Sequence, residues 1–343
     1  MLRLHSRGAP YERGLAHGKA FAAIIEEHID TTCKIEPGYD DKIGELLARL
    51  KKNITALAPA QLEELHGIAD GAGLEPDAVL KLCYWPEVTS GTVGLRFCSL
   101  IGVSDAEGGP ILAKNSDHPL CTVRFLLLQR VDNSGGHSYI RGTFAGTLGT
   151  RAGINDAGLA MTTATIVPDA TNWDGVPLMV VAQAILEQCA TVDEAIALAK
   201  ELRTVNYGAH LMVADARGNV ADIECMPDQT GVRWPEKDLL FNTNHPLAMN
   251  TCDHSAAARD LDDNSHARYN RLQTLLAETP HTVAGLQSIL RSHVQPGRIC
   301  QHGGLADLHT TSSYILLPKQ RKMLMAPGCP CQYDYIPVTV EAT

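Results

Sequence analysis

The sequence lacks the features that mark membrane, secreted and nucleic-acid-binding proteins. No window approaches the run of about 18 apolar residues that crosses a bilayer. The formal net charge of −10 provides no basic surface for nucleic acid. The first residues, Met1 to Arg7, contain no apolar stretch of the kind that a secretory signal requires. We therefore expect a cytoplasmic protein that binds neither membranes nor nucleic acid.

The sequence also lacks a glycine-rich phosphate loop after its first predicted strand, as well as internal repeats, low-complexity stretches and linkers. The missing loop argues against a doubly wound parallel sheet. The 343 residues are 45% hydrophobic, which is enough for a large core. Length alone would allow roughly two domains.

Cysteine, in contrast, is plentiful, with ten residues dispersed along the chain. In a reducing compartment most of them should be buried as small hydrophobic residues. Cys329 and Cys331 are one residue apart, which is closer than the spacing of a zinc knuckle. Several histidines lie in the second half of the chain, but we predict no metal site and no cofactor. These histidines are residues 245, 254, 293, 302 and 309.

Hydrophobic periodicity divides the chain into a helical first part and a mixed second part. Thr191 and Glu194 have the spacing of a capping box, which predicts a helix start. Residues 149–158 are predicted to form a glycine-rich loop. Helices are expected from 11, over 40–57, from 59, over 76–85 and 178–187, from 191, and over 265–277 and 282–293. Strands are expected over 98–104, 110–115, 123–131, 137–144, 159–166, 210–214, 220–224 and 239–244, with a closing hairpin over 312–317 and 323–325.

A block of strands, a pair of helices and then more strands favours sheets that helices cover on the outside. Short turns join the first strands, so these strands must be antiparallel.

A cysteine begins the first strand, directly after the helical part. Cys98 follows Phe97 and precedes Ser99, and Asn115 and Asp117 lie across the predicted hairpin. This arrangement suggests that the chain cuts itself between Phe97 and Cys98. The cut would leave a thiol and a new α-amine on the same residue. A thiol has a free pKa near 8.5 and an α-amine one near 7.7–8.0, so the amine is suited to accept the thiol proton near neutral pH.

Several motifs together resemble one known family. Cys98-Ser99 with Asn115-x-Asp117 looks like the nucleophile hairpin of N-terminal-nucleophile hydrolases. The ordered set is most similar to the acyl-coenzyme A:6-aminopenicillanic acid acyltransferase (penicillin acyltransferase) family, which shares its fold with choloylglycine hydrolases. The other motifs are Tyr11-Glu12-Arg13-Gly14-x-x-His17-Gly18, Gly153-Ile154-Asn155-Asp156-Ala157-Gly158-Leu159-Ala160, Thr243-Asn244-His245 and Ile299-Cys300-Gln301-His302-Gly303.

The resemblance implies an α+β fold, a four-layer αββα sandwich of two mainly antiparallel sheets. It also implies autoproteolysis into a small chain, residues 1–97, and a large chain, residues 98–343, which together form one domain. Matched by motif, Cys98 is the nucleophile, Asp117 orients the site and Asn244 belongs to the oxyanion hole.

Two positions depart from the relatives. Lys114 stands where choloylglycine hydrolases have arginine, and Gln301 stands where acyltransferases often have arginine. Lysine keeps the charge but loses the bidentate fork, whereas glutamine loses the charge. Lys114 fits a solvated lysine as well as a site residue. We expect supporting or substrate-binding roles for Ser99, Lys114, Asn115, Thr165 and Gln301.

We therefore predict a self-processing cysteine amidohydrolase that acts on a small N-acylated compound through a thioester on Cys98. One alternative is acyl transfer between an amide or a coenzyme A thioester and a small amine. Another is an unprocessed, non-catalytic binding protein, and a third is a Cys/His hydrolase that uses Cys300 and His302. The sequence leaves the substrate and a homo-oligomer open.

Overall fold

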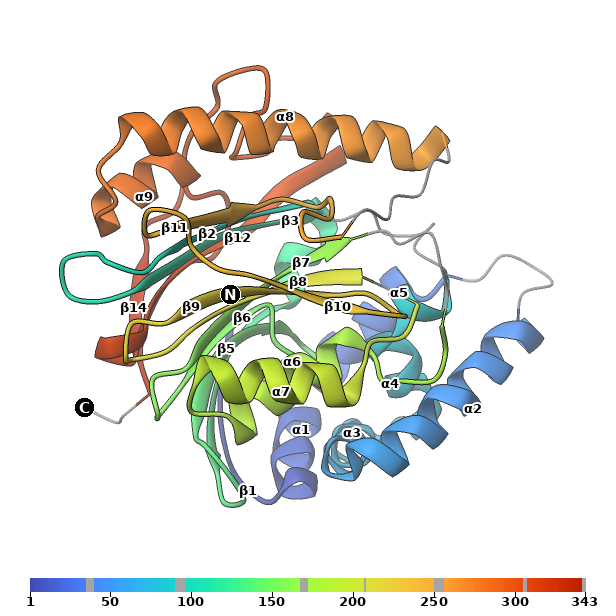
Figure 1. Ribbon diagram of the computed structural model, residues 1–343. Helices are drawn as coiled ribbons and strands as arrows, with labels where there is room; N and C mark the ends of the chain where they lie inside the picture. Colours follow the sequence, from blue (N-terminus) through green and yellow to red (C-terminus); the bar gives the residue numbers. More distant parts are fainter. Residues whose placement is uncertain are drawn as a thin grey trace.

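Two β-sheets lie face to face, and helices cover the outer side of each sheet (Figure 1). This arrangement confirms the predicted four-layer αββα architecture. The computed structural model describes residues 1–34, 40–89, 97–166, 172–206, 208–249, 256–304 and 307–340.

The larger sheet has eight strands in the order β1-β4-β5-β6-β7-β8-β9-β10. Its edge strand β1 pairs with β4 in parallel, and the other pairs are antiparallel. The strands are β1 (Leu2–Gly8), β4 (Leu126–Asn133), β5 (Tyr139–Phe144), β6 (Ala152–Asn155), β7 (Ala160–Ile166), β8 (Gly208–Ala214), β9 (Val220–Cys225) and β10 (Thr230–Arg233).

The smaller sheet has six antiparallel strands in the order β11-β2-β3-β12-β13-β14. It contains both strands of the hairpin that the sequence singles out. The strands are β11 (Leu239–Asn242), β2 (Phe97–Val103), β3 (Ile111–Pro119), β12 (Leu308–Leu317), β13 (Lys322–Ala326) and β14 (Ile336–Thr339).

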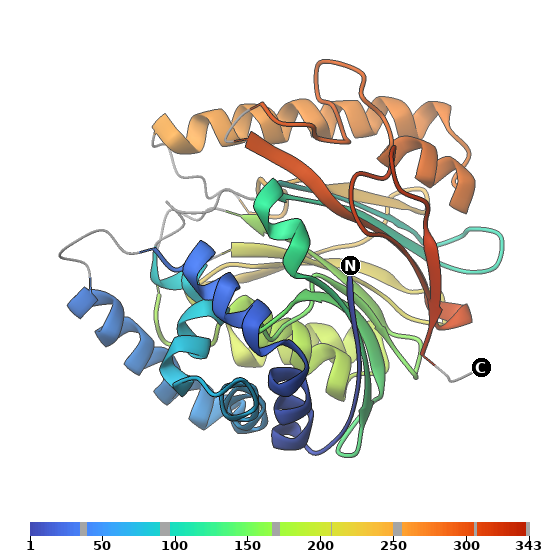
Figure 2. The ribbon, with the colours of Figure 1, turned by 180° about the vertical axis from the view of Figure 1, so that it is seen from behind.

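The helices form the two outer layers. Helices α8 (Ala256–Glu278) and α9 (Val283–Leu290) lie on the outer side of the six-stranded sheet, and the opposite view shows the same arrangement (Figure 2). None of the described helices is long and apolar enough to cross a membrane. The remaining helices are α1 (Pro10–Thr32), α2 (Asp40–Leu57), α3 (Pro59–Ala72), α4 (Pro76–Cys83), α5 (Trp85–Val88), α6 (Leu178–Gln188) and α7 (Val192–Leu202).

The apolar side chains form three clusters that match these layers. One cluster joins α1–α7 to the eight-stranded sheet, a second fills the space between the sheets, and a third joins α8 and α9 to the six-stranded sheet. Alternate residues of β2 therefore enter different clusters: Cys98 and Leu100 enter the second, and Ile101 and Val103 enter the third. This alternation follows from the two-residue period of a strand.

Glycines allow α1 to pack closely on α3. A Cβ atom on Gly14 would lie 2.0 Å from the Glu64 carbonyl oxygen, and one on Gly18 would lie 2.1 Å from that of Ile68. The same helix carries buried Arg13 and His17, so this motif of the sequence serves helix packing.

Most of the predicted elements are present, and the capping box is confirmed because Glu194 N–H donates to Thr191 Oγ1 at 3.3 Å. Three predictions need correction. The expected loop over 149–158 contains the short strand β6. The expected strand over 123–131 begins in a 3₁₀ helix, Leu120–Phe125. The expected helix over 76–85 divides at Tyr84, whose backbone is non-helical, into α4 and α5.

Candidate active site

Cys98 is the second residue of β2, and its side chain points into the space between the two sheets. It lies directly opposite Ser116 on β3. Opposite residues of an antiparallel pair share a face, and Cys98 contacts the cluster that contains Leu100 and Leu112. Cys98 is 4% exposed. The predicted hairpin is therefore confirmed, and it places the thiol at the end of a buried strand.

The main-chain nitrogen of Cys98 is held by Asn244. The Cys98 N–H donates to Asn244 Oδ1 at 2.9 Å. Asn244 lies just beyond β11, the strand that pairs with the other side of β2. Its Nδ2 donates to the Thr165 carbonyl oxygen at 2.8 Å. The structure thus brings together three predicted site residues, Cys98, Asn244 and Thr165, at the bond that is predicted to break.

Arg268 is a site residue that the sequence analysis missed. It lies on α8, and its guanidinium donates to the Cys98 carbonyl oxygen, to Ser99 Oγ at 3.2 Å and to Asn244 Oδ1 at 2.8 Å. Its carbon also lies 5.0 Å from the centre of the Phe97 ring. Burial lowers the pKa of Arg268 to about 10, against the influence of the Asp117 carboxylate. Arg268 therefore supports both sides of the Phe97–Cys98 bond.

The loop that carries Asn244 is fixed by polar contacts on both of its sides. On one side, the Asn244 N–H donates to Ser265 Oγ of α8 at 2.8 Å. On the other, Glu224 of β9 accepts the N–H groups of Leu247 and Ala248 at 2.7–2.9 Å. These contacts fix the position of the Asn244 amide before any substrate arrives.

Buried His210 extends this support. It bonds Asp222 at 2.9 Å through Nδ1 and the His245 carbonyl oxygen at 3.0 Å through Nε2. Burial alone would lower the pKa of His210, but the Asp222 carboxylate raises it overall. The charged imidazole can donate both of these hydrogen bonds.

Asp117 lies on the other face of β3 from Ser116, toward α8. Its Oδ1 accepts the Thr310 hydroxyl at 2.6 Å. Among the described residues, its buried Oδ2 has no hydrogen-bond partner. Burial raises the pKa of Asp117 to about 6, although Arg268 and the Thr310 hydroxyl act in the opposite direction. Asp117 is therefore a buried carboxyl group with one acceptor oxygen that no described residue uses.

Asn115 shares the face of Asp117 and anchors the segment that follows α9. Its Nδ2 donates to the carbonyl oxygens of Leu290 at 2.9 Å and Ile299 at 3.1 Å. These contacts give Asn115 a supporting role in the structure.

Lys114 is 1% exposed, so the alternative of a solvated lysine is wrong. Its Nζ donates to the carbonyl oxygens of Arg151 at 3.0 Å and Thr163 at 2.6 Å. Because alternate residues of a strand share a face, Lys114 lies on the Cys98 side of the sheet. Through these hydrogen bonds the ammonium group of Lys114 links the six-stranded sheet to the eight-stranded sheet.

Gln301 supports Asp117 with its main-chain N–H and not with its side chain. The Gln301 N–H donates to Thr310 Oγ1 at 2.8 Å, and the same hydroxyl donates to Asp117. Its side-chain amide donates to the Arg298 carbonyl oxygen. The structure therefore places Gln301 in the support of Asp117.

A cavity of about 250 Å³ lies between the helical layer and the sheets. Thr165 borders it and also accepts the Asn244 amide, so the cavity reaches the junction region. Tyr84 is fully buried in the core, whereas its neighbour Trp85 borders the cavity. Other lining residues are Phe144, Leu178, Met179 and Arg151.

The sequence and the fold are similar to those of several known proteins. The sequence profile of the family described as acyl-coenzyme A:6-aminopenicillanic acid acyl-transferase matches residues 104–326. That segment contains Asp117, Asn244 and Arg268 and begins directly after β2. The 40 kDa form of the acyl-coenzyme A:6-aminopenicillanic-acid-acyltransferase of Emericella nidulans is 25% identical over 284 residues, which cover 81% of this chain and 78% of that protein.

Protein dcd1A of Dictyostelium discoideum is 24% identical over 226 residues, which cover 55% of this chain and 50% of that protein. Among solved structures, the Caenorhabditis elegans ortholog of N-acylethanolamine-hydrolyzing acid amidase is similar with a TM-score of 0.48 and 17% identity, over 65% of this chain and 93% of that chain. Penicillin V acylase from Agrobacterium tumefaciens has a TM-score of 0.45 and 14% identity, over 67% of this chain and 82% of that chain.

Proposed function

This chain belongs to the acyl-coenzyme A:6-aminopenicillanic acid acyl-transferase family, and on that premise we propose that it is a self-processing cysteine amidohydrolase. It would cleave the amide of a small N-acylated compound through a thioester on Cys98. One observation carries the proposal. The nitrogen of the Phe97–Cys98 bond is held by the side-chain amide of Asn244, with Arg268 on the same amide oxygen.

The first proposed reaction is self-cleavage. The Cys98 thiolate attacks the carbonyl carbon of Phe97, the C–N bond breaks, and the released nitrogen takes up a proton to become the α-amine. Water then hydrolyses the thioester, which returns the thiol and leaves a carboxylate on Phe97. Asn244 Oδ1 accepts the N–H of the departing nitrogen throughout, which fixes the direction of that nitrogen.

The two fragments, residues 1–97 and 98–343, would stay together after the cut. Strand β1 of the first fragment pairs along its full length with β4 of the second. Buried Arg13 of the first fragment also forms an ion pair of 2.9 Å with Glu187 of the second. The fragments therefore share one sheet and one buried ion pair, which supports a single domain made of two chains.

The second proposed reaction is turnover on a substrate amide. The new α-amine accepts the thiol proton, Cys98 attacks the substrate carbonyl, and the amine returns the proton to the leaving nitrogen. Asp117 Oδ2, which has no partner among the described residues of the uncut chain, is available to accept the α-ammonium. The Asn244 amide would donate to the oxyanion, a contribution of about 2.7–4 kcal/mol for one donor.

The cavity beside Thr165 is our candidate for the acyl pocket. Its walls include Trp85, Phe144 and Leu178, which suit an apolar or aromatic acyl group. A volume of about 250 Å³ lies below the 300–1,000 Å³ of typical ligand sites, which favours a small acyl group.

Acyl transfer is the second candidate, because the Emericella nidulans relative is named as an acyltransferase that uses acyl-coenzyme A. Both reactions share the Cys98 thioester and differ only in whether water or an amine accepts the acyl group. Product analysis with and without an added amine or acyl-coenzyme A separates them.

The test is a panel of N-acyl amines, N-acyl amino acids and lactams, offered to the processed protein and to Cys98→Ala. We expect release of a small acyl group by the wild type and none by the variant. Met179→Ala, which widens the cavity, should shift the preference toward longer acyl groups. Leu198→Ala, on the neighbouring α7 and outside the cavity lining, is the matched control. Equal activity in wild type and Cys98→Ala would contradict the proposal, and no turnover of any acyl compound would favour a binding protein.

A further inference from the structure

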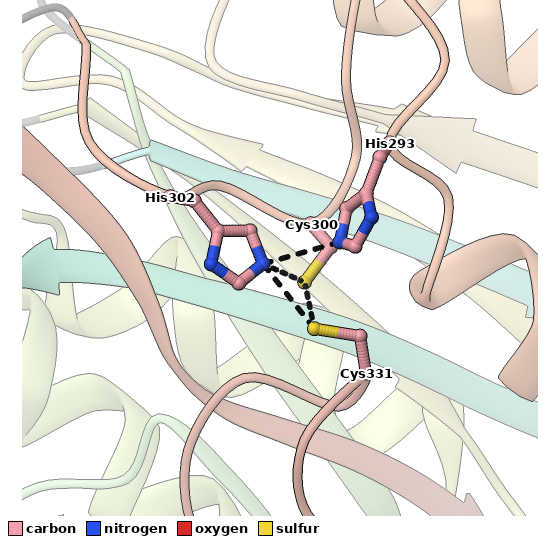
Figure 3. A group of neighbouring side chains, drawn as sticks. All are labelled: His293, Cys300, His302 and Cys331. Carbon is pink, nitrogen blue, oxygen red and sulfur yellow. Dashed lines mark hydrogen bonds between the residues drawn. The ribbon is translucent and has the colours of Figure 1, made fainter.

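Four side chains from separate parts of the chain lie close together beside the start of β12. His293, Cys300 and His302 lie in the loop that follows α9, and Cys331 lies in the loop between β13 and β14 (Figure 3). Each offers one nitrogen or sulfur atom, and these four atoms lie within 4.8 Å of one another.

Four of the six distances between these atoms are close to those of a tetrahedron around one metal ion. Bond lengths of about 2.3 Å to sulfur and 2.0–2.1 Å to nitrogen place two sulfurs about 3.8 Å apart, two nitrogens about 3.3–3.4 Å apart, and sulfur and nitrogen about 3.5 Å apart. The Cys300 and Cys331 sulfurs are 3.8 Å apart. The Nε2 atoms of His293 and His302 are 3.1 Å apart. From His302 Nε2 the distances are 3.5 Å to the Cys300 sulfur and 3.2 Å to that of Cys331.

We propose that His293, Cys300, His302 and Cys331 bind one structural Zn²⁺ ion. Two thiolates and two imidazoles form a Cys₂His₂ ligand set, which suits zinc. All four tetrahedral positions are taken by protein atoms, so no position is open for substrate or water. The ion therefore serves structure and not chemistry, and Cys300 and His302 act as ligands rather than as a nucleophile and its base.

Cys329 contacts the second ring nitrogen of His302. Its sulfur lies 3.8 Å from Nδ1, the ring nitrogen that faces away from the ligand cluster. A ligating histidine usually donates this second N–H to a nearby acceptor, which fixes its ring orientation and tautomer. Cys329 is therefore a supporting residue for His302 and not a fifth ligand.

The ion would tie together two loops. Residues 291–304 and 327–335 contain no regular helix or strand in the part of the chain that the structure describes. Arg291 Nε donates to the Pro330 carbonyl oxygen at 2.8 Å, so the two loops contact each other without a metal ion. A metal cross-link between loops stabilises the folded state because the unfolded chain does not present a formed site.

The same loop reaches the candidate active site. Gln301 lies between the ligands Cys300 and His302, and its N–H donates to Thr310 Oγ1 at 2.8 Å. Thr310 in turn donates to Asp117 at 2.6 Å. Zinc would thus hold the main-chain donor that orients the Thr310 hydroxyl toward Asp117.

No metal was predicted from the sequence because the one-residue spacing of Cys329 and Cys331 does not fit a zinc knuckle. The structure instead combines Cys331 with Cys300, which lies far from it in sequence, and places Cys329 outside the ligand set. This combination depends on the neighbouring strands β12 and β13 and is not a local spacing motif.

The test is the zinc content of the full-length protein, purified without chelators and measured by elemental mass spectrometry. We expect about one zinc ion per chain, and a loss to background in Cys331→Ser. Cys121→Ser, which alters another exposed cysteine, should keep the metal. Replacing zinc with Co²⁺ should give the visible absorption of a tetrahedral site with thiolate ligands. Cys329→Ala keeps all four ligands and should weaken zinc affinity about 10–100-fold.

Wild-type protein without zinc after growth in zinc-replete medium would overturn the proposal, and so would zinc that persists in the Cys300→Ser/Cys331→Ser variant. A Cys300–Cys331 disulfide in the intact mass of freshly purified protein would also overturn it. These measurements need neither self-cleavage nor a substrate. They therefore succeed or fail independently of the proposed amidohydrolase.

Discussion

Two buried polar clusters of this protein use their charges in different ways. Below the eight-stranded sheet, Arg13 forms ion pairs of 2.9 Å with both Glu64 and Glu187. At the β2 junction, Arg268 donates to uncharged oxygens of the Cys98 main chain and Asn244, and Asp117 keeps one oxygen without a partner among the described residues.

We interpret the first cluster as structural and propose that the second is functional. The Arg13 cluster pairs opposite charges and joins α1, α3 and α6, so its main effect is on the stability of the fold. The junction cluster contains a carboxyl group whose pKa burial raises to about 6. Buried groups with perturbed pKa values gather at functional sites. The released α-ammonium of Cys98 would supply a cationic hydrogen-bond donor for Asp117 Oδ2.

The largest effect on stability is expected for Arg13→Ala in the Cys98→Ala background. Removing Arg13 leaves buried Glu187 without its ion-pair partner and leaves Glu64 with Arg141, 3.6 Å away. Breaking a buried pair in this way typically costs about 3–5 kcal/mol. Chemical denaturation measures this change. Arg49→Ala breaks an exposed pair with Asp174 and should cost less than about 1 kcal/mol. Equal losses for the two variants would refute the structural role of the Arg13 cluster.

Asn244→Ala should slow self-cleavage and turnover about 10²–10³-fold, because it removes the amide that holds the Cys98 nitrogen and serves the oxyanion. The measurement is the rate at which precursor is lost on denaturing gels, together with steady-state kinetics. Asn270→Ala, on the exposed side of α8, is the control and should match the wild type. A wild-type rate in Asn244→Ala would remove this residue from the mechanism.

The Asp117 carboxyl should make the stability of the uncut protein depend on pH. Its folded pKa of about 6 exceeds its unfolded value of 3.8, so the folded state favours the protonated form. Its contribution is fully present below about pH 4 and is lost as the pH rises through 6, a change of about 3 kcal/mol. The measurement compares Cys98→Ala with Cys98→Ala/Asp117→Asn by denaturation from pH 4 to 7. A constant difference across that range would contradict the buried carboxyl.

Thr310→Val should have the smallest of these effects. It removes a hydroxyl that lowers the pKa of Asp117, so the upper end of the pH range over which the uncut Cys98→Ala protein loses stability should move to higher pH. Thr311→Val is the matched control, because its hydroxyl donates to the Ser116 carbonyl oxygen instead. Identical shifts in both variants would show a general effect on β12.

The sequence predicted those parts of the fold that local patterns specify. Strands β2 and β3 and the capping box of α7 follow from periodicity and from short-range hydrogen bonds. Strand β1 was missed, because a short edge strand with polar residues in alternate positions gives a weak apolar signal and its partner β4 is far along the chain.

The sequence predicted only those site residues that lie within or beside the family motifs. Cys98, Asp117 and Asn244 were proposed from ordered motifs, and the structure gathers them around one bond; their roles stay predictions. Arg268 lies in a polar stretch of α8, and such a sequence predicts a solvent-exposed helix face. Tertiary packing nevertheless buries this side chain. Lys114 was uncertain for the same reason, since its burial depends on contacts with Arg151 and Thr163 from the other sheet.

The most direct test is the N-terminal sequence and intact mass of freshly purified wild-type protein, beside Cys98→Ala. The account predicts a fragment that begins with Cys98 at its free amine and a companion that ends at Phe97, with one uncut chain in the variant. Fully active wild-type protein whose Phe97–Cys98 peptide bond is intact would contradict it.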